Sequence, residues 1–395
     1  MKKRVLYYEL AKYLGHKNAL FITGMRQVGK TTLMKQIFHE VNTPKLWFDF
    51  ENPLDTLLFE NTNYDAVYEE LLKASGSNSV RLTVFIDEIQ NYPEITRIIK
   101  YHIDKYGVKY IATGSSNYYL KNLFPESLSG RKFLFVLNPL SFKEYLYFTD
   151  KGAEPLLIQN EFVTGAALRE YKMHESDYND YVEFGGFPEV AVTRDIDTKK
   201  LILRNIFSSF FEKDIKILSD LKDIKDLRDL ILLLVPRAGN ILDVSKLAVE
   251  LGVNRPKLYG YFELLQGVFF IRLLQRYSVS IDRSVAGGRK VYFCDTGLLN
   301  TIGKVNEGQL FENAVANQLV HYGDLCYYNK RNKSEIDFII NNETGIEVKL
   351  KGTSGDLNKL RRMSDEIGLK KYFIVSRGYT EIDRRSEERR VGKEC

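Results

Sequence analysis

Cysteine is scarce in this sequence. The 395 residues include three cysteines, Cys294, Cys326 and Cys395, with no C-x-x-C spacing between them. This pattern excludes a zinc ribbon or a framework of disulfides, and a chain so poor in cysteine is typical of a reducing, cytoplasmic setting. The five histidines are scattered along the chain without the spacing of metal ligands.

Long apolar runs and a targeting segment are also missing. No run approaches the roughly 20 apolar residues that span a membrane. Residues 1–4 are basic, but Glu9 and Lys12 interrupt the stretch that a signal peptide would keep apolar. We therefore expect a cytoplasmic protein with no membrane partner.

A strong charge imbalance is absent as well. Lysine and arginine number 57 against 52 aspartates and glutamates, a net charge of +5 that is compatible with nucleic acid but does not require it. Apolar residues make up 44% and charged residues 28%, as in soluble globular proteins. A chain of 395 residues is too long for one core, so we expect two to four domains.

The last eleven residues, 385–395, differ in character from the rest. They resemble the translation of a sequencing adapter, although charge content alone also allows a polar native tail. We expect an artefact and leave the segment out of fold reasoning. It holds four basic and three acidic residues, so the remainder carries +5 − 1 = +4.

A phosphate-binding pattern organises the chain. Residues 24–32 read Gly-Met-Arg-Gln-Val-Gly-Lys-Thr-Thr, which is the P-loop pattern G-x-x-x-x-G-K-[ST]. An apolar run at 19–23 predicts a buried parallel strand before it, and 33–38 predicts a helix after it. Glycines let the backbone curl around a phosphate chain, and the helix N-terminus adds positive charge. The predicted ATP-binding residues are Gly24, Gln27, Val28, Gly29, Lys30, Thr31 and Thr32.

A second pattern supplies carboxylates. Residues 84–90 read Val-Phe-Ile-Asp-Glu-Ile-Gln, an apolar strand that ends in Asp87 and Glu88, as in a Walker B motif. Asp87 and the Thr31 hydroxyl are the predicted partners of Mg²⁺. Glu88 is the predicted general base that polarises the attacking water, and Lys30 is expected on the β- and γ-phosphates. The alternative is a strand end with two solvated carboxylates, which the preceding P-loop makes the less favoured interpretation.

Two weaker candidates follow. Residues 110–116 predict a strand that ends in Ser115 and Ser116, either of which suits a sensor of the γ-phosphate; turn chemistry explains the same residues. Arg131, within Leu-Ser-Gly-Arg-Lys at 128–132, is a candidate arginine finger. An ordinary surface arginine fits equally well. Because such a finger often comes from a neighbouring subunit, a homo-oligomer is expected.

These motifs, in this order, resemble the AAA-type ATPases of bacteria and archaea that carry a C-terminal domain of unknown function. The resemblance implies ATP binding and hydrolysis with Mg²⁺, and catalytic roles for Glu88, Lys30, Arg131 and Ser115. The pieces that carry it are residues 24–32, 87–90, 113–116, 129–131, 139–145 and the Gly-Gly-Phe-Pro-Glu stretch at 185–189.

Helical periodicity continues through residues 146–225, which predict a helical lid. The resemblance implies that such a lid can carry a sensing arginine, for which Arg204 is the candidate. Residues 226–285 predict a winged helix, with helices at 244–251 and 255–265 and a wing strand at 269–274. If this module binds DNA, the predicted contacts are Arg255, Lys257 and Tyr259. A winged helix that only packs against protein remains an equal alternative.

The C-terminal segment, 286–384, carries a D…E-x-K order in Asp337, Glu347 and Lys349. The order resembles the core of restriction-endonuclease-like nucleases, in which carboxylates hold Mg²⁺ and a lysine assists the water. Glu312 on a preceding helix is a further candidate ligand. The alternative is an alternating strand with solvated charges, since short matches of this kind arise by chance.

We therefore predict an α/β protein with a P-loop parallel sheet (1–145), a helical lid (146–225), a winged helix-turn-helix (226–285) and a restriction-endonuclease-like α/β domain (286–384). The predicted function is an ATP-binding and ATP-hydrolysing motor or switch coupled to DNA. Two alternatives stay open: a nucleotide-gated, Mg²⁺-dependent nuclease, and a signalling or scaffold ATPase whose C-terminal modules bind only protein.

Overall fold

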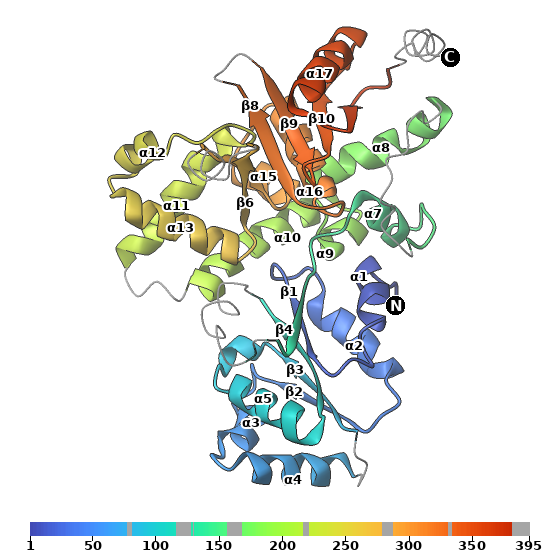
Figure 1. The fold of residues 1–395 in the computed structure, drawn as a ribbon, viewed down its shortest axis with the longest axis vertical. Coiled ribbons are helices and arrows are strands. Elements are labelled where there is room, and N and C mark those ends of the chain that lie inside the picture. The colour runs from blue at the N-terminus through green and yellow to red at the C-terminus, as the bar shows by residue number, and fades with distance from the viewer. Residues whose placement is uncertain are drawn as a thin grey trace. The chain divides into compact units, whose positions relative to one another are not determined.

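The computed structural model describes residues 1–76, 81–115, 128, 130–155, 168–215, 221–278, 287–330 and 334–380 (Figure 1). The chain forms two compact units. The N-terminal unit comprises Met1–Ile158, Gly186–Leu227 and Asn254–Phe270, and the C-terminal unit comprises Gln159–Gly185, Arg228–Val253 and Ile271–Cys395. Ser116, Ser129 and the segment 385–395 lie outside the described residues.

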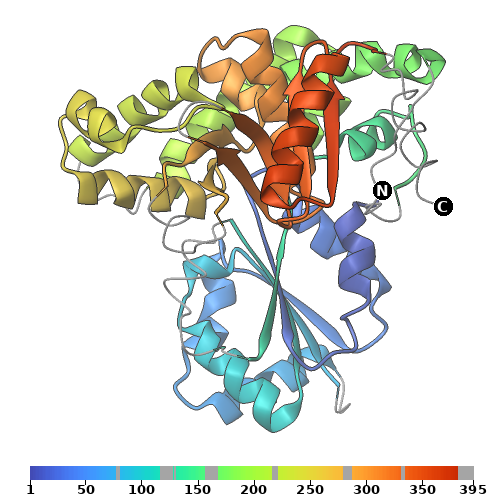
Figure 2. The same ribbon diagram turned by 45° about the horizontal axis from the view of Figure 1, so that its top comes forward.

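The N-terminal unit contains a five-stranded parallel sheet with strand order β2-β3-β4-β1-β5. Helices lie on both faces of this sheet (Figure 2). Its strands are β1 (Ala19–Thr23), β2 (Lys45–Asp49), β3 (Thr83–Asp87), β4 (Lys109–Gly114) and β5 (Lys132–Val136). Its helices are α1 (Val5–Ala11), α2 (Lys30–Glu40), α3 (Pro53–Leu57), α4 (Tyr64–Ser75), α5 (Ile95–Tyr106), α7 (Phe142–Phe148), α9 (Pro188–Val192), α10 (Ile196–Ser209) and α13 (Arg255–Gly267), with short turns at Leu58–Glu60, Ile89–Asn91 and Phe210–Asp214.

Burial follows position in this sheet. Every residue of β1 and β3 is buried, as expected for central parallel strands covered on both faces, whereas β2 at one edge is only half-buried. The predicted P-loop sheet is therefore confirmed. The P-loop follows the carboxyl end of β1, and ligands of open parallel sheets bind outside the carboxyl ends of the strands.

Helix α5 shows how local pattern and packing agree. Its buried positions include Ile95, Ile98, Ile99 and Ile103, at the three- and four-residue spacing of one helical face. The opposite face carries charged side chains and remains exposed. Gly107 ends the helix in a left-handed conformation that glycine adopts without strain.

The C-terminal unit contains a mixed six-stranded sheet with strand order β11-β10-β9-β8-β6-β7. The strands are β6 (Ile271–Arg276), β7 (Lys290–Phe293), β8 (Leu325–Asn329), β9 (Glu335–Ile340), β10 (Thr344–Lys349) and β11 (Lys371–Ser376). The helices are α8 (Leu168–Phe184), α12 (Val244–Leu251), α15 (Thr296–Ile302), α16 (Glu307–Leu319) and α17 (Ser354–Ile367), with a short turn at Val235–Arg237; α11 (Leu221–Leu234) has residues in both units.

The predicted wing strand exists as β6, shifted by two residues. It pairs with β7 in antiparallel and with β8 in parallel orientation, so it belongs to the six-stranded sheet of the C-terminal unit. Helices α12 and α13 form at the predicted positions, capped by Asp243 and Asn254. Within the described residues, no helix is long and apolar enough to cross a membrane.

Candidate nucleotide site and the charged clusters

The P-loop joins β1 to α2 and depends on its two glycines. Gly24 has φ 147°, and a Cβ at this position would lie 2.2 Å from the carbonyl oxygen of Leu137, so no other residue fits. Gly29 has φ 96° and is the N-cap of α2. Gln27 adopts φ 61°, a conformation that non-glycine residues seldom take outside special turns. The loop is thus curled as the sequence predicts.

Lys30 lies inside this loop. Its side chain is buried, and Nζ donates to the carbonyl oxygens of Gly24 at 3.0 Å and Met25 at 2.8 Å. Its N-terminal neighbour Gly29 offers no side chain to cap α2, so no cap side chain bonds the N–H groups of the first turn. Thr31 is half-buried and Thr32 exposed in that first turn.

The predicted Walker B residues lie at the carboxyl end of β3. Asp87 is 5% exposed and accepts a hydrogen bond from the hydroxyl of Thr113 on the neighbouring strand β4. The backbone N–H of Glu88 donates to the same hydroxyl oxygen at 3.3 Å. Glu88 itself has φ 51°, so the chain turns sharply directly after the strand. Thr113 therefore connects both carboxylate residues to β4.

A polar network extends from Glu88 to the predicted sensor. The side-chain amide of Gln90 donates to the Glu88 carboxylate and, at 3.2 Å, to the hydroxyl of Ser115, which is fully buried. The amide oxygen of Gln90 is buried and without a hydrogen-bond partner among the described residues. Ser115 and Glu88 are predicted from the sequence, whereas the contacts of Thr113 and Gln90 become evident only in the structure. The sequence features that point to them are the position of Thr113 at the end of β4 and that of Gln90 two residues after Glu88.

A buried ion pair between Arg4 and Glu144 contacts the backbone of the P-loop. Arg4, before α1, donates to the Glu144 carboxylate from Nε at 2.8 Å, and its Nη1 donates to the carbonyl oxygen of Val28 at 3.0 Å. Burial alone would raise the pKa of Glu144, but the Arg4 guanidinium outweighs it and holds the pKa at about 2. The C=O and N–H of a trans peptide point in opposite directions. The contact to Val28 therefore turns the N–H of Gly29 away from Arg4.

Arg131 does not lie beside its own P-loop. Its carbonyl oxygen accepts from Ala19 N–H, at the start of β1, whereas the P-loop follows the other end of that strand. Five strand residues span about 13 Å. The Arg131 guanidinium is instead bound to Asp104, with Nε 2.6 Å and 2.9 Å from the two carboxylate oxygens. In the described residues the Arg131 side chain is therefore paired with Asp104, and its catalytic role as an arginine finger stays a prediction.

Helix α10, in the segment predicted as a lid, contacts the P-loop and carries Arg204. Gln27 in the P-loop donates to the Ser209 hydroxyl of α10 at 3.4 Å, which connects the loop to this helix within the N-terminal unit. Arg204 lies on α10 with an exposed side chain. A sensing role for Arg204 stays a prediction.

The site fits a magnesium-bound triphosphate. Lys30 and the uncapped first turn of α2 offer positive charge and N–H donors to phosphate. The Thr23 hydroxyl, directly before the loop, is buried and lacks a partner among the described residues. The Asp87 carboxylate and Thr31 hydroxyl are hard oxygen ligands, and a nucleotide-bound Mg²⁺ needs only one or two of these from protein.

Among the predicted DNA contacts, Lys257 is already paired. Its Nζ lies 2.5 Å from Asp223 and 3.2 Å from Asp226, and the Tyr261 hydroxyl donates to Asp223 at 3.1 Å. An ammonium held by two carboxylates contributes little net attraction for a phosphate, contrary to expectation. Tyr259 is 47% exposed and remains accessible.

The D…E-x-K residues of the C-terminal unit are brought together. Asp337 on β9 accepts from the backbone N–H of Val348 on β10 at 2.9 Å. Lys349 Nζ donates to Glu347 at 2.7 Å, and the second carboxylate oxygen of Glu347 is buried without a partner. Burial, followed by the charge of Asp337, raises the pKa of Glu347 to about 7. The predicted spatial cluster of these three residues is present.

Lys290 lies among the carboxylates that were predicted to hold a metal ion in the C-terminal unit. Lys290 on β7 is 1% exposed, and its ammonium contacts Glu335 and lies 3.6 Å from both Glu312 and Asp337. The described residues contain no group of three or more Asp, Glu, His or Cys side chains arranged to hold a metal ion. Glu312 and Asp337 face the Lys290 ammonium instead. Metal binding by Asp337, Glu347 and Glu312 therefore stays a prediction.

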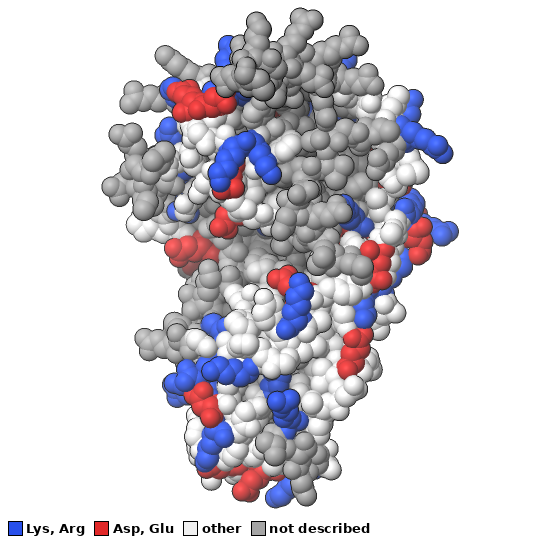
Figure 3. All heavy atoms as spheres, turned by 45° about the vertical axis from the view of Figure 1, so that its right-hand side comes forward, with Lys and Arg blue, Asp and Glu red and all other residues white. Residues whose placement is uncertain are grey.

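Surface charge is mixed on the face shown in Figure 3. Among the residues drawn in colour, lysine and arginine lie between aspartate and glutamate, and no field of one sign covers this face. A broad basic surface for duplex DNA is therefore not seen on this side.

Three family models match parts of the chain. Residues 16–146 match a family described as an AAA domain. Residues 175–309 match one domain of unknown function (DUF8612), and residues 307–391 match another (DUF4143). The first match supports an AAA-type P-loop ATPase in the segment that holds the nucleotide site. The C-terminal matches are to domains of unknown function, so the likeness to nucleases stays a prediction.

Two relatives match most of this chain. An uncharacterized protein of Methanocaldococcus jannaschii is 27% identical over 356 residues, covering 87% of this chain and 76% of that protein. An uncharacterized protein of Haemophilus influenzae is 27% identical over 383 residues, covering 92% and 90%. Among solved structures, a Walker-type ATPase of Pyrococcus abyssi matches with 15% identity and a TM-score of 0.49, covering 76% of this chain and 96% of that one.

Proposed function

We propose that the chain binds ATP with Mg²⁺ at the P-loop and hydrolyses it, and that the nucleotide state acts as a switch on the later segments. One observation carries the proposal. The P-loop and the network of Asp87, Glu88, Gln90 and Ser115 follow the carboxyl ends of neighbouring strands β1, β3 and β4. Phosphate donors and a candidate base thus share one edge of the sheet.

The residues divide the work as follows. Lys30 and the N–H groups of the first turn of α2 bind the phosphates, and Thr31 with Asp87 holds the metal ion. Mg²⁺, when bound, neutralises charge on the phosphate oxygens. Glu88 accepts a proton from the attacking water, and Gln90 holds the Glu88 carboxylate in place. Ser115, through Gln90, senses whether the γ-phosphate is present.

Contacts of the P-loop transmit a change of nucleotide state to neighbouring helices. Gln27 contacts α10 at Ser209, and Arg4 connects Val28 to Glu144 at the start of α7. A change in the loop on phosphate binding therefore reaches both helices directly. DNA is the proposed target of the switch, through helix α13, with Tyr259 and Arg255 as contacts.

A nucleotide-gated nuclease is the second candidate. It is favoured by the meeting of Asp337, Glu347 and Lys349 on paired strands, and opposed by the Lys290 ammonium among the carboxylates. Nuclease activity that survives a Lys349→Ala substitution would rule out this site as its source.

The test is ATP hydrolysis by the purified chain, with and without DNA, beside Lys30→Ala and Glu88→Gln. Loss of turnover in both variants supports the site, and an increase with DNA supports the target. Hydrolysis that ignores DNA, with no salt-sensitive DNA binding, favours instead an ATPase whose later modules bind protein.

A further inference from the structure

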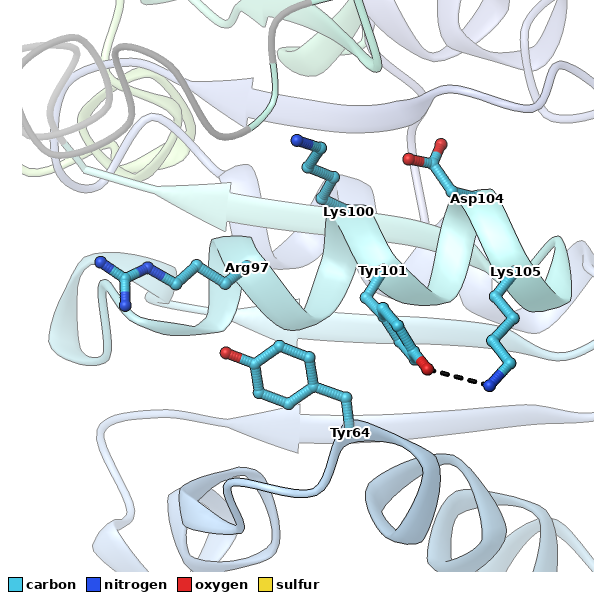
Figure 4. A pocket seen from close by; sticks show the side chains of 6 residues that line it. All are labelled: Tyr64, Arg97, Lys100, Tyr101, Asp104 and Lys105. Atoms are coloured by element: carbon cyan, nitrogen blue, oxygen red, sulfur yellow. Dashed lines mark hydrogen bonds between the residues drawn. The ribbon is translucent and has the colours of Figure 1, made fainter.

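An open pocket lies on the outer face of α5, away from the P-loop residues. It has a volume of about 390 Å³ and is lined by Tyr64, Arg97, Lys100, Tyr101, Asp104 and Lys105 (Figure 4). All but Tyr64 come from α5, at the spacing that places residues on one side of a helix. Tyr64 is the first residue of α4. The pocket therefore lies wholly within the N-terminal unit.

The charges around the pocket are unevenly paired. Lys105 is bound to Asp65 at 2.9 Å, and Asp104 is bound to Arg131 at 2.6 Å, so these four charges cancel in pairs. Arg97 and Lys100 are exposed, and their side chains make no hydrogen bond or ion pair in the described part of the chain. Two unpaired positive charges remain, which favours an anionic ligand.

The aromatic wall is held in place before any ligand arrives. The Tyr101 hydroxyl donates to Asp65 at 2.7 Å and accepts from Lys105 at 2.9 Å, which fixes its ring. The Tyr64 ring meets it edge-to-face, with centroids 5.6 Å apart. The Tyr64 hydroxyl makes no hydrogen bond within the described residues and lies at the end of the pocket toward which Arg97 extends (Figure 4).

We propose that this pocket binds one nucleotide unit of single-stranded nucleic acid, with the phosphate on Arg97 and Lys100 and the base against Tyr64 and Tyr101. Single-strand sites combine cations for the backbone with aromatic rings on which bases stack. The volume is at the small end of ligand pockets, roughly 300–1,000 Å³, which suits one unstacked nucleotide. A duplex offers no free base face to these rings, and an acidic peptide would not need them.

The pocket is distinct from the ATP site and does not depend on hydrolysis. Its chemistry is shared by a free nucleotide, so the two sources must be separated by experiment. The assay is fluorescence anisotropy with a labelled 12-mer of mixed single-stranded DNA, performed on the Lys30→Ala chain so that the P-loop is disabled. Competing AMP, duplex DNA and polyglutamate are then added.

The variant Arg97→Ala/Lys100→Ala is expected to weaken binding at least tenfold and to reduce the slope of log K against log salt by about 0.7, for the one phosphate that these two side chains neutralise on a single strand. The control, Lys73→Ala/Arg81→Ala, removes the same charge from exposed positions of the same unit outside the pocket. It should leave affinity within twofold. Equal losses in both double variants would overturn the site.

Stacking of a base on Tyr64 is tested separately from phosphate binding. Tyr64→Phe should bind as the parent does, whereas Tyr64→Ala should lose fivefold or more and should no longer quench 2-aminopurine placed in the oligonucleotide. Thermal melting of each variant checks that the fold survives. Competition by AMP as strong as by the oligonucleotide would assign the pocket to a free nucleotide, and competition by polyglutamate would overturn the proposal in favour of an acidic protein.

Discussion

Replacing Arg4 by alanine should both destabilise the N-terminal unit and weaken nucleotide binding. Arg4 is 5% and Glu144 3% exposed, so the substitution leaves a buried carboxylate without its cation. Breaking a buried pair in this way costs about 3–5 kcal/mol. The pKa of Glu144, about 2 against an ordinary 4.5, gives a consistent figure of roughly 3 kcal/mol.

The pH dependence has a definite sign. Because the folded pKa of Glu144 is lowered, the native state binds fewer protons than the unfolded state between pH 2 and 4.5. The contribution of the pair is therefore complete above about pH 4.5 and lost as the pH falls toward 2. The Arg4→Ala variant should lack this acid-sensitive component.

The measurement is urea denaturation of the parent, Arg4→Ala, Glu144→Gln and the double variant, with ATP affinity measured on each. We expect a coupling energy of about 2 kcal/mol or more in the double-mutant cycle. ATP affinity should fall because the Gly29 peptide loses the contact at Val28. A cost below about 1 kcal/mol, with unchanged ATP affinity, would refute the reasoning.

Three further predictions address the other sites. Gly24→Ala should abolish the rise in Tm on adding ATP, because its Cβ would collide with Leu137, whereas Gly15→Ala, with open space around it, should not. Lys290→Met should destabilise the C-terminal unit by about 3–5 kcal/mol in denaturant, and Mn²⁺ should raise the Tm of this variant but not of the parent. Burial raises the folded pKa of Glu347 to about 7, so its carboxyl contributes stability below about pH 4.5 that is lost as the pH rises through 7. In denaturation experiments from pH 5 to 8, Glu347→Gln should remove this fall in the free energy of unfolding with pH. An unchanged pH dependence in the variant would contradict the prediction.

Local patterns predicted the curled P-loop and the carboxylates at the end of β3 because both are encoded in adjacent residues. The P-loop needs its glycines at fixed spacing, and Asp87 and Glu88 follow directly on an apolar strand. The strand context was correct for both. Ser115 could also be placed, since a strand end next to Walker B faces the same edge of a parallel sheet.

Long-range pairing could not be predicted in the same way. Lys257 is neutralised by aspartates about thirty residues earlier, and Arg4 meets Glu144 across nearly the whole AAA segment. Lys290 enters the carboxylate cluster only because β7 and β9 belong to one sheet. Whether a charge is free or paired depends on these contacts, which one sequence does not display.

The pairing of β6 illustrates the same limit. Its residues predict a strand, and a strand forms, but its partners β7 and β8 lie in the segment assigned to the next domain. Sequence periodicity indicates that a strand exists; it does not indicate which sheet the strand joins.

ATP turnover by the chain beside Lys30→Ala and Glu88→Gln tests the central claim most directly. We expect measurable hydrolysis in the parent, loss of binding in Lys30→Ala, and retained ATP binding without hydrolysis in Glu88→Gln. Hydrolysis that persists in Glu88→Gln, or ATP binding that is unaffected by Lys30→Ala, would contradict the assignment of this site.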